Sequence, residues 1–127
     1  MSNQELITFS TDTIQDSAQN SPGDFEIASA AFERRDGSTA ARIWRTLAEQ
    51  GHAMAQHNLG LMYGRGLGVP QDYCEALTWF RLAAEQGRAG AQHNLGSMYA
   101  NGLGVTQDHE EAVKWFRLAD NQTNGTS

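Results

Sequence analysis

Cysteine, lysine and long apolar runs are scarce in this chain of 127 residues. The single cysteine, Cys74, cannot form an internal disulfide bond, so we expect a reducing compartment, the cytoplasm. No apolar run approaches the roughly 20 residues that a helix needs to cross a bilayer, which argues against a membrane helix. The first basic residue is Arg34, so the N-terminus also lacks the basic region that secretory and transit peptides carry.

Positive charge is also scarce. The 9 basic residues face 15 acidic ones, which gives a formal net charge of −6, and Lys114 is the only lysine. Binding to a phosphate backbone requires a concentrated basic surface. Nucleic acids and anionic membranes are therefore not expected as partners.

What the chain does contain is a tandem duplication. Residues 51–86 and 87–122 can be superposed without a gap at an offset of 36, and 24 of the 36 positions are identical. Self-similarity at such a period is typical of a solenoid, in which each unit buries its apolar face against its neighbours. It indicates a binding protein rather than a catalyst.

The first helix of each copy is predicted from its apolar face. Ala55, Leu59 and Met62 recur at helical spacing, which predicts a helix over residues 53–63 and a counterpart one repeat later. Gly60 lies inside this helix and also recurs. A glycine at this position suggests that two helices cross there with their backbones close together.

The second helix of each copy follows a glycine-rich loop. The loop over residues 66–71 recurs over residues 102–107, and its glycines permit the positive φ of a sharp reversal. Asp72 and Glu75 then have the spacing of a capping box, which predicts the start of the second helix. The aromatic residues predicted to lie in the core are Trp44, Trp79, Phe80, Trp115 and Phe116.

A diverged third copy precedes the two full ones. Residues 24–50 have the same helical period with an inter-helix loop about five residues shorter, and Ser38 is expected to cap the second helix. The predicted fold is all-α, a solenoid of three antiparallel helix pairs. This repeat domain is predicted to cover residues 23–122.

Polar segments flank the predicted repeat domain. Residues 1–22 are expected to form a flexible tail, and residues 123–127 a second one. The alternative for the first segment is that its short apolar patch at Leu6, Ile7 and Phe9 docks onto the first helix.

One set of positions is shared by both full copies. In the first copy it comprises Ala55, Leu59, Gly60, Met62, Tyr63, Gly66, Gly68, Val69, Asp72, Ala76, Trp79, Ala83, Ala84, Gln86 and Gly87. In the second copy it comprises Ala91, Leu95, Gly96, Met98, Tyr99, Gly102, Gly104, Val105, Asp108, Ala112, Trp115 and Ala119. This pattern resembles the Sel-1-like repeat family, a relative of the tetratricopeptide repeats, and departs from it at Asp120, where the family usually has alanine.

The resemblance covers residues 51–122 and, loosely, residues 24–50. It implies a right-handed superhelix of helix pairs that acts as a scaffold or adaptor and holds a protein or peptide along its concave side. Some secreted, cysteine-rich members of the family are linked to β-lactam binding or hydrolysis. Cys74 has no counterpart in the next copy, where Glu110 stands, so those properties are harder to transfer.

The candidate reactive residues do not form a catalytic or metal site. His57 and His93 occupy equivalent positions, but neither has a second histidine, cysteine or carboxylate one helical turn away. Cys74 has no histidine placed locally to act as its base. We therefore predict no metal, no cofactor and no catalytic residue. For His57, a hydrogen bond to a neighbouring hairpin and a contact with a partner both remain open.

Differences between the copies indicate which positions stacking leaves free. The face of the first helices opposite the apolar stripe varies from copy to copy, and we expect it to line the concave side. The candidate partner-binding residues are Met54, His57, Leu61, Gly64 and Arg65, then His93, Ser97 and Asn101, and Glu26 and Glu33 in the diverged copy. Gly90 is the counterpart of Met54 on the same face of the third hairpin. Met54 and Leu61 suit a partner with an apolar anchor.

The sequence thus predicts a small cytoplasmic, bacterial adaptor that binds a protein or peptide and performs no chemistry. An enzyme related to the β-lactam-active family members is one alternative. A self-assembling structural unit is another, because the C-terminal end lacks a capping helix and could support a homo-oligomer.

Overall fold

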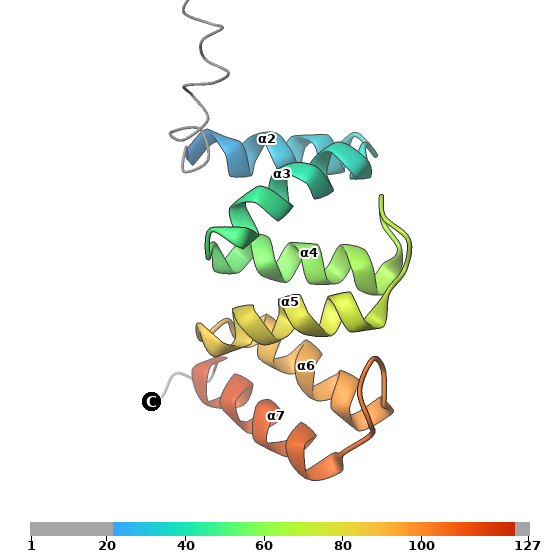
Figure 1. Cartoon of the computed structure of the whole chain (residues 1–127). Helices are drawn as coiled ribbons and strands as arrows, with labels where there is room; N and C mark the ends of the chain where they lie inside the picture. The colour runs from blue at the N-terminus through green and yellow to red at the C-terminus, as the bar shows by residue number, and fades with distance from the viewer. Residues whose placement is uncertain (1–21, 124–127) are drawn as a thin grey trace, which may run out of the picture.

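In a computed structural model of the chain, residues 22–123 are described, and they form six helices without a strand (Figure 1). The helices are α2 (Pro22–Glu33), α3 (Gly37–Glu49), α4 (Ala53–Arg65), α5 (Tyr73–Glu85), α6 (Ala89–Asn101) and α7 (His109–Thr123). The extensive helix contacts join consecutive helices, so the chain is a stack of three antiparallel hairpins. The predicted all-α solenoid is confirmed. The two predicted tails, residues 1–22 and 123–127, lie outside the described residues except for residues 22 and 123.

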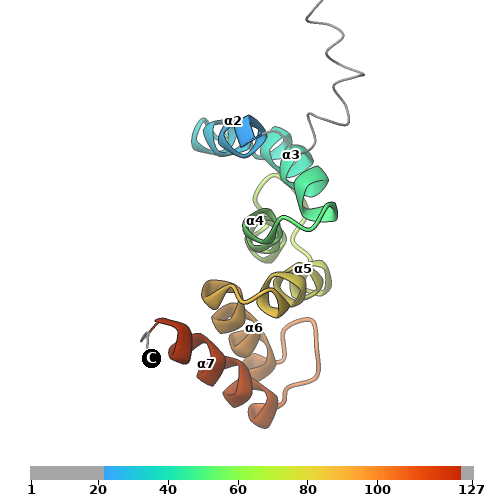
Figure 2. The ribbon, with the colours of Figure 1, turned by 90° about the vertical axis from the view of Figure 1, so that its left-hand side faces the viewer.

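The stack bends, and this bend defines an inner side (Figure 2). Helix α4 lies on the inner side of the bend, between α2 and α6, whereas α3 and α5 lie on the outer side. The first helix of each hairpin is therefore placed to line the inner surface, as expected from the sequence.

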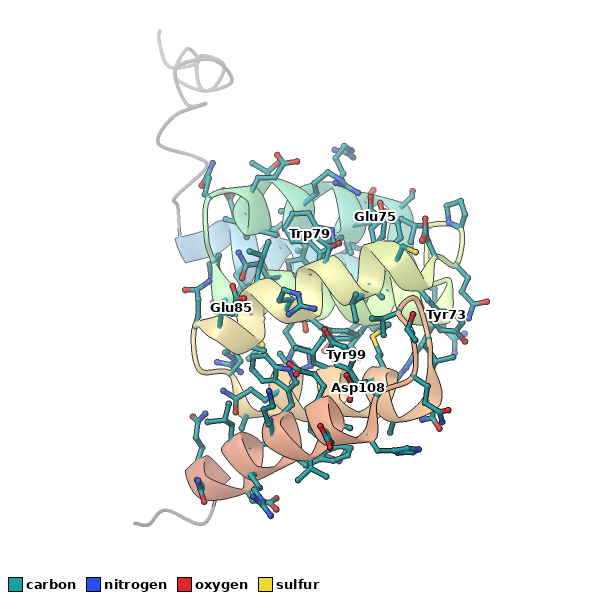
Figure 3. All side chains as sticks on the ribbon, turned by 60° about the horizontal axis from the view of Figure 1, so that its bottom comes forward. Tyr73, Glu75, Trp79, Glu85, Tyr99 and Asp108 are labelled. Atoms are coloured by element: carbon teal, nitrogen blue, oxygen red, sulfur yellow. The ribbon has the colours of Figure 1, made fainter. Side chains whose placement is uncertain are left out.

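Aspartates start the second helices. Asp72 Oδ1 accepts hydrogen bonds from the backbone N–H groups of Cys74 at 3.0 Å and Glu75 at 3.1 Å. Glu75 does not complete a capping box, because its carboxylate accepts from Trp79 Nε1 at 3.1 Å, one turn along α5 (Figure 3). The cap of α3 is Asp36, and the prediction of Ser38 is wrong.

Two clusters of buried side chains fill the interior, and each spans two hairpins. Trp79 of α5 is buried in the cluster of the first hairpin, which joins the first two hairpins through one core. Trp44 and Phe80 are also buried, as predicted. Trp115 and Phe116 are only partly buried, because no hairpin in the described part of the chain covers α7.

The repeated glycines Gly60 and Gly96 make room for an aromatic ring. A Cβ atom on Gly60 would lie 2.8 Å from the Phe80 ring, and one on Gly96 would lie 2.8 Å from the Phe116 ring. At Gly60 the nearest atoms belong to a ring of the partner helix and not to its backbone, whereas at Gly96 the Ala112 carbonyl oxygen would also lie 3.2 Å from an added Cβ atom, a close backbone approach as predicted.

Each glycine-rich loop reaches back to the preceding hairpin. Gly68 packs against the backbone of Gly37 at the start of α3. Gly104 packs against the backbone of Tyr73 at the start of α5, where the loop before α7 runs beside it (Figure 3). The loops therefore attach hairpin to hairpin as well as closing their own.

Candidate functional site

Three hollows lie between the helices, and neighbouring hollows share lining residues. The first, of about 210 Å³, lies among α4, α5 and α6, and the second, of about 110 Å³, among α2, α3 and α4. Both are lined by Leu61 and Arg65. The third, of about 390 Å³, shares Phe32 and Leu67 with the second. We name these three neighbouring hollows together the inner groove.

The C-terminal half of α4 forms the central wall of the inner groove. Leu61, Gly64 and Arg65 lie three and four residues apart, so they share one helix face. Gly64 has no side chain, so it leaves open space on this face. A Cβ atom added at Gly64 would have only the Ala76 Cβ within 4 Å, at 3.7 Å. Ser97 faces them from α6. Four predicted partner-binding residues are thus brought together in one hollow.

His57 and Gly90 lie at the junction between the second and third hairpins. His57 Nε2 is 3.3 Å from Asn94 Nδ2 of α6, and its ring lies 5.8 Å from the Phe80 ring. Gly90 is needed there, because a Cβ atom would lie 2.8 Å from His57 Cε1. The interpretation of His57 as a hydrogen-bonding partner of the next hairpin is confirmed. Met54 lies at the same junction, with its sulfur 3.4 Å from an Arg88 nitrogen.

The other predicted site residues do not line the three hollows. Glu26 and Glu33 are exposed on α2. His93 is exposed and packs beside the Phe116 ring at 5.2 Å. Asn101 donates from its amide to the Ser97 carbonyl oxygen at 3.0 Å.

The lining residues that were not among the predicted partner-binding residues include Phe32, Arg35, Tyr73 and Asn94. Phe32 fits the apolar stripe of α2, and only the structure places its ring partly outside the core, 39% exposed. Tyr73 directly follows a helix cap, a position that gave no sign of facing the groove. Asn94 had a signal, because it recurs beside His93 as Asn58 does beside His57.

The charge of the inner groove is opposite to that of the chain. The charged side chains that line its three hollows are Arg35 and Arg65, and no carboxylate lines them. The chain as a whole has a net charge of −6. The groove therefore combines apolar walls with a local positive charge.

Comparison with known proteins identifies the repeat. Residues 53–87 and 89–122, more than half of the chain, match the model of the Sel1 repeat. The chain belongs to the Sel1 repeat family. No curated protein matches it.

Two solved structures illustrate how this Sel1 repeat chain compares with its relatives. A protective antigen of uropathogenic Escherichia coli strains that displays an SLR fold is 40% identical over 96% of the chain, with a TM-score of 0.77. The chain spans about a quarter of that protein, 26% of its length. A Sel1 repeat protein from Oxalobacter formigenes is 32% identical over 87% of this chain and 88% of its own, with a TM-score of 0.76.

Within residues 22–123 of this Sel1 repeat chain, no group of three or more histidine, cysteine or acidic residues is placed to hold a metal ion. Cys74 is exposed, and its sulfur lies 3.9 Å from the Gly104 carbonyl oxygen. None of the described helices has the length and apolar character that crossing a membrane requires.

The junction histidine gives the repeat stack a pH dependence. Burial lowers the pKa of His57 below its ordinary value of 6.5, and the nearby Arg88 guanidinium lowers it further. Below pH 6.5 the unfolded chain therefore binds a proton at His57 before the folded chain does. The contribution to stability is present above pH 6.5 and is lost as the pH falls from 6.5 to the lowered pKa.

We expect the variant His57→Gln to lose less unfolding free energy than the wild type between pH 7.5 and pH 5.5, chosen to span about one unit above and below the ordinary histidine value. Urea denaturation at both pH values measures this difference. His93→Gln, the same change at the exposed copy of the position, is the matched control. Identical pH dependence in the wild type and His57→Gln would contradict the assignment.

Proposed function

We propose that this Sel1 repeat chain is a non-enzymatic adaptor that binds a segment of another protein in the inner groove. Sel1 repeat proteins are generally protein-interaction scaffolds. The observation that carries the proposal is the groove itself, three neighbouring hollows with partly exposed apolar walls on a packed helical stack.

Leu61 is the central contact in this proposal. It is only partly buried, and it lines two adjacent hollows, so a ligand side chain in either hollow would cover it. Phe32 and Tyr73, 39% and 38% exposed, supply apolar surface toward the two ends. Covering such surface removes it from water, at roughly 25 cal/mol per Å² of apolar area.

The stack holds these side chains before a partner arrives. Gln56 of α4 donates to the Ala48 carbonyl oxygen of the preceding hairpin at 3.0 Å, and Gln92 of α6 donates to the Ala84 carbonyl oxygen at 3.1 Å. Both glutamines are buried, so these hydrogen bonds fix one hairpin against the next. A groove whose walls are already fixed loses less conformational entropy when it binds.

The proposed setting is the cytoplasm of a bacterium. Two similar structures come from bacteria, and one free, exposed cysteine suits a reducing compartment. The proposed partner is a protein or peptide, without nucleic acid, membrane, metal or cofactor.

Selection of peptides tests the proposed adaptor function. A library of random 12-residue peptides is panned against the immobilised protein, and the selected peptides are titrated by fluorescence anisotropy. We expect peptides with leucine, phenylalanine or methionine anchors whose binding requires Leu61. Failure to recover any Leu61-dependent peptide, or nitrocefin hydrolysis by the purified protein, would contradict the proposal.

Self-association is a second candidate, favoured by a repeated contact between hairpins. Arg45 of α3 donates to the Tyr63 hydroxyl and lies over its ring at 5.5 Å. Arg81 of α5 does the same with Tyr99, at 5.7 Å from its ring. Arg117 occupies the equivalent position of α7 and is exposed, with no such tyrosine facing it among the described residues.

We propose that a second copy of the chain can stack on this surface of α7. Val113 is 43% exposed there, whereas Leu77, its equivalent in α5, is partly buried against the core that α5 shares with the third hairpin. Sedimentation equilibrium should give a mass that rises with protein concentration, and Val113→Glu should lower it. A monomer mass at all concentrations would exclude this candidate.

A further inference from the structure

We propose that the inner groove selects an acidic segment, in which an apolar anchor is flanked by aspartate or glutamate residues that bind Arg35 and Arg65. This inference rests on the proposed adaptor function and names the chemistry of its partner. It is carried by two independent observations, the charge of the groove and the backbone conformation of Arg35.

The first observation is that these two guanidinium groups are not used by the fold. Arg35 and Arg65 make no ion pair within residues 22–123. In contrast, Arg45 and Arg81 bind tyrosine hydroxyls, and Arg88 lies against the sulfur of a methionine. Within the same residues, Arg34, Arg42 and Arg117 are also unpaired but do not line the hollows. The groove therefore has two of the five unpaired arginines of the described residues and no carboxylate, although the chain is acidic.

The second observation is the backbone of Arg35, which has a φ of +68° at the end of α2. It is the only residue other than glycine with positive φ in the described part of the chain. Gly66 and Gly102 end α4 and α6 in the same left-handed conformation, with φ of +68° and +67°. A side chain is unfavourable in this conformation, which is why glycine prevails there.

Arg35 therefore stands where folding alone favours glycine. Its backbone completes the helix end as a glycine would: the Arg35 N–H donates to the Phe32 carbonyl oxygen at 3.0 Å, and the Asp36 N–H donates to the Ala31 carbonyl oxygen at 2.8 Å. The extra feature that arginine brings is a side chain at the 390 Å³ hollow. A strained residue at a binding surface points to a functional use of that side chain.

The two guanidinium groups lie at different hollows, with apolar walls between them. Arg35 lines the third hollow and Arg65 lines the first two, while Phe32 and Leu67 line the stretch in between. A guanidinium group binds a carboxylate through two parallel hydrogen bonds, a geometry that fits aspartate and glutamate. The complementary segment places its apolar side chain between two carboxylates. Glu33 is exposed and does not line these hollows, so it does not neutralise them.

Peptides selected from the 12-residue library on the wild-type protein should be enriched in aspartate and glutamate beside their apolar anchors. The double variant Arg35→Gln/Arg65→Gln should bind a selected peptide about tenfold more weakly, the combined effect of two partly exposed ion pairs. Its affinity should also depend less on salt. Arg34→Gln/Arg42→Gln removes two exposed arginines that do not line the groove and should bind as the wild type does.

The variant Arg35→Gly distinguishes a binding role of the Arg35 side chain from a purely structural role, because the two roles predict different changes in melting temperature and in peptide binding. It should raise the melting temperature by about 3–6 °C, because glycine relieves the left-handed conformation. It should also weaken binding of the selected acidic peptide, whereas a copy of that peptide with amides in place of its carboxylates should bind both proteins equally.

The outcomes separate this inference from the proposed function. Leu61-dependent peptides without acidic enrichment, bound equally by the double arginine variant, would overturn the acidic preference and leave the adaptor function standing. The absence of any Leu61-dependent peptide would overturn both.

Discussion

Replacing Leu61 with glutamate is expected to weaken the binding of a selected peptide at least about 100-fold. Leu61 lines two adjacent hollows of the inner groove, so the change removes apolar contact from both. Loss of a leucine contact and desolvation of the new carboxylate together exceed the roughly 2.7 kcal/mol that a 100-fold change represents. Fluorescence anisotropy with labelled peptide measures the effect.

Two matched variants accompany Leu61→Glu. Leu61→Ser introduces the residue that the third hairpin has at the equivalent position, Ser97, and should weaken binding without disturbing the fold. Leu82→Glu changes a leucine of α5 that is 39% exposed and does not line the groove, and it should bind normally. Equal binding by all three variants, with unchanged helical content, would reject the groove as the binding site.

Replacing Gly104 with alanine is expected to destabilise the protein by about 2–5 kcal/mol. Gly104 has a φ of +72°, and an added Cβ atom would lie 2.5 Å from the Tyr73 carbonyl oxygen. The contact is with backbone at the start of α5, which cannot move aside as a flexible side chain does. The loop would have to lift off the preceding hairpin. Urea denaturation monitored by circular dichroism measures the loss.

Gly87→Ala is the matched control for Gly104→Ala. Gly87 also has a positive φ, +96°, but an added Cβ atom would meet nothing within 4 Å. This variant reports conformational strain alone, about 1–2 kcal/mol. If both variants lose the same free energy, the contact between loop and preceding hairpin does not contribute to stability.

The repeat and its hairpins could be predicted from the sequence because helical period is a local property. Ala55, Leu59 and Met62 lie at spacings that only a helix brings to one face, and all three are buried. The aspartate cap Asp72 was predicted on the same basis. Such signals depend on residues a few positions apart, which a single sequence displays directly.

Contacts between hairpins were harder to predict because they depend on how the units stack. The Phe80 ring fills the space over Gly60, although the sequence suggested two backbones there. Gly90 matters because His57 of the preceding hairpin packs against it. The loop glycine Gly104 similarly serves a contact with α5. Nothing in the sequence around these glycines identifies the group that approaches them.

Only part of the candidate site could be predicted from the sequence, because the site also depends on how the hairpins stack. The helical period placed Leu61 and Gly64 on one face, and the structure has both in one hollow together with Arg65, another predicted partner-binding residue. Helical spacing shows which face of a helix a residue lies on, but it does not show which part of that face a neighbouring hairpin covers. His57 shares that helix and lies at the hairpin junction, where Asn94 and Gly90 of the next hairpin contact it.

Amide chemical-shift mapping by NMR tests the central claim, that the inner groove binds the partner, most directly. The labelled protein is titrated with a selected peptide. The largest shifts are predicted at Leu61, Gly64, Arg65 and Ser97, the residues that line the hollow among α4, α5 and α6. Largest shifts instead at exposed residues of α3 and α5 that line none of the hollows, such as Arg42, Thr78 and Leu82, would contradict it.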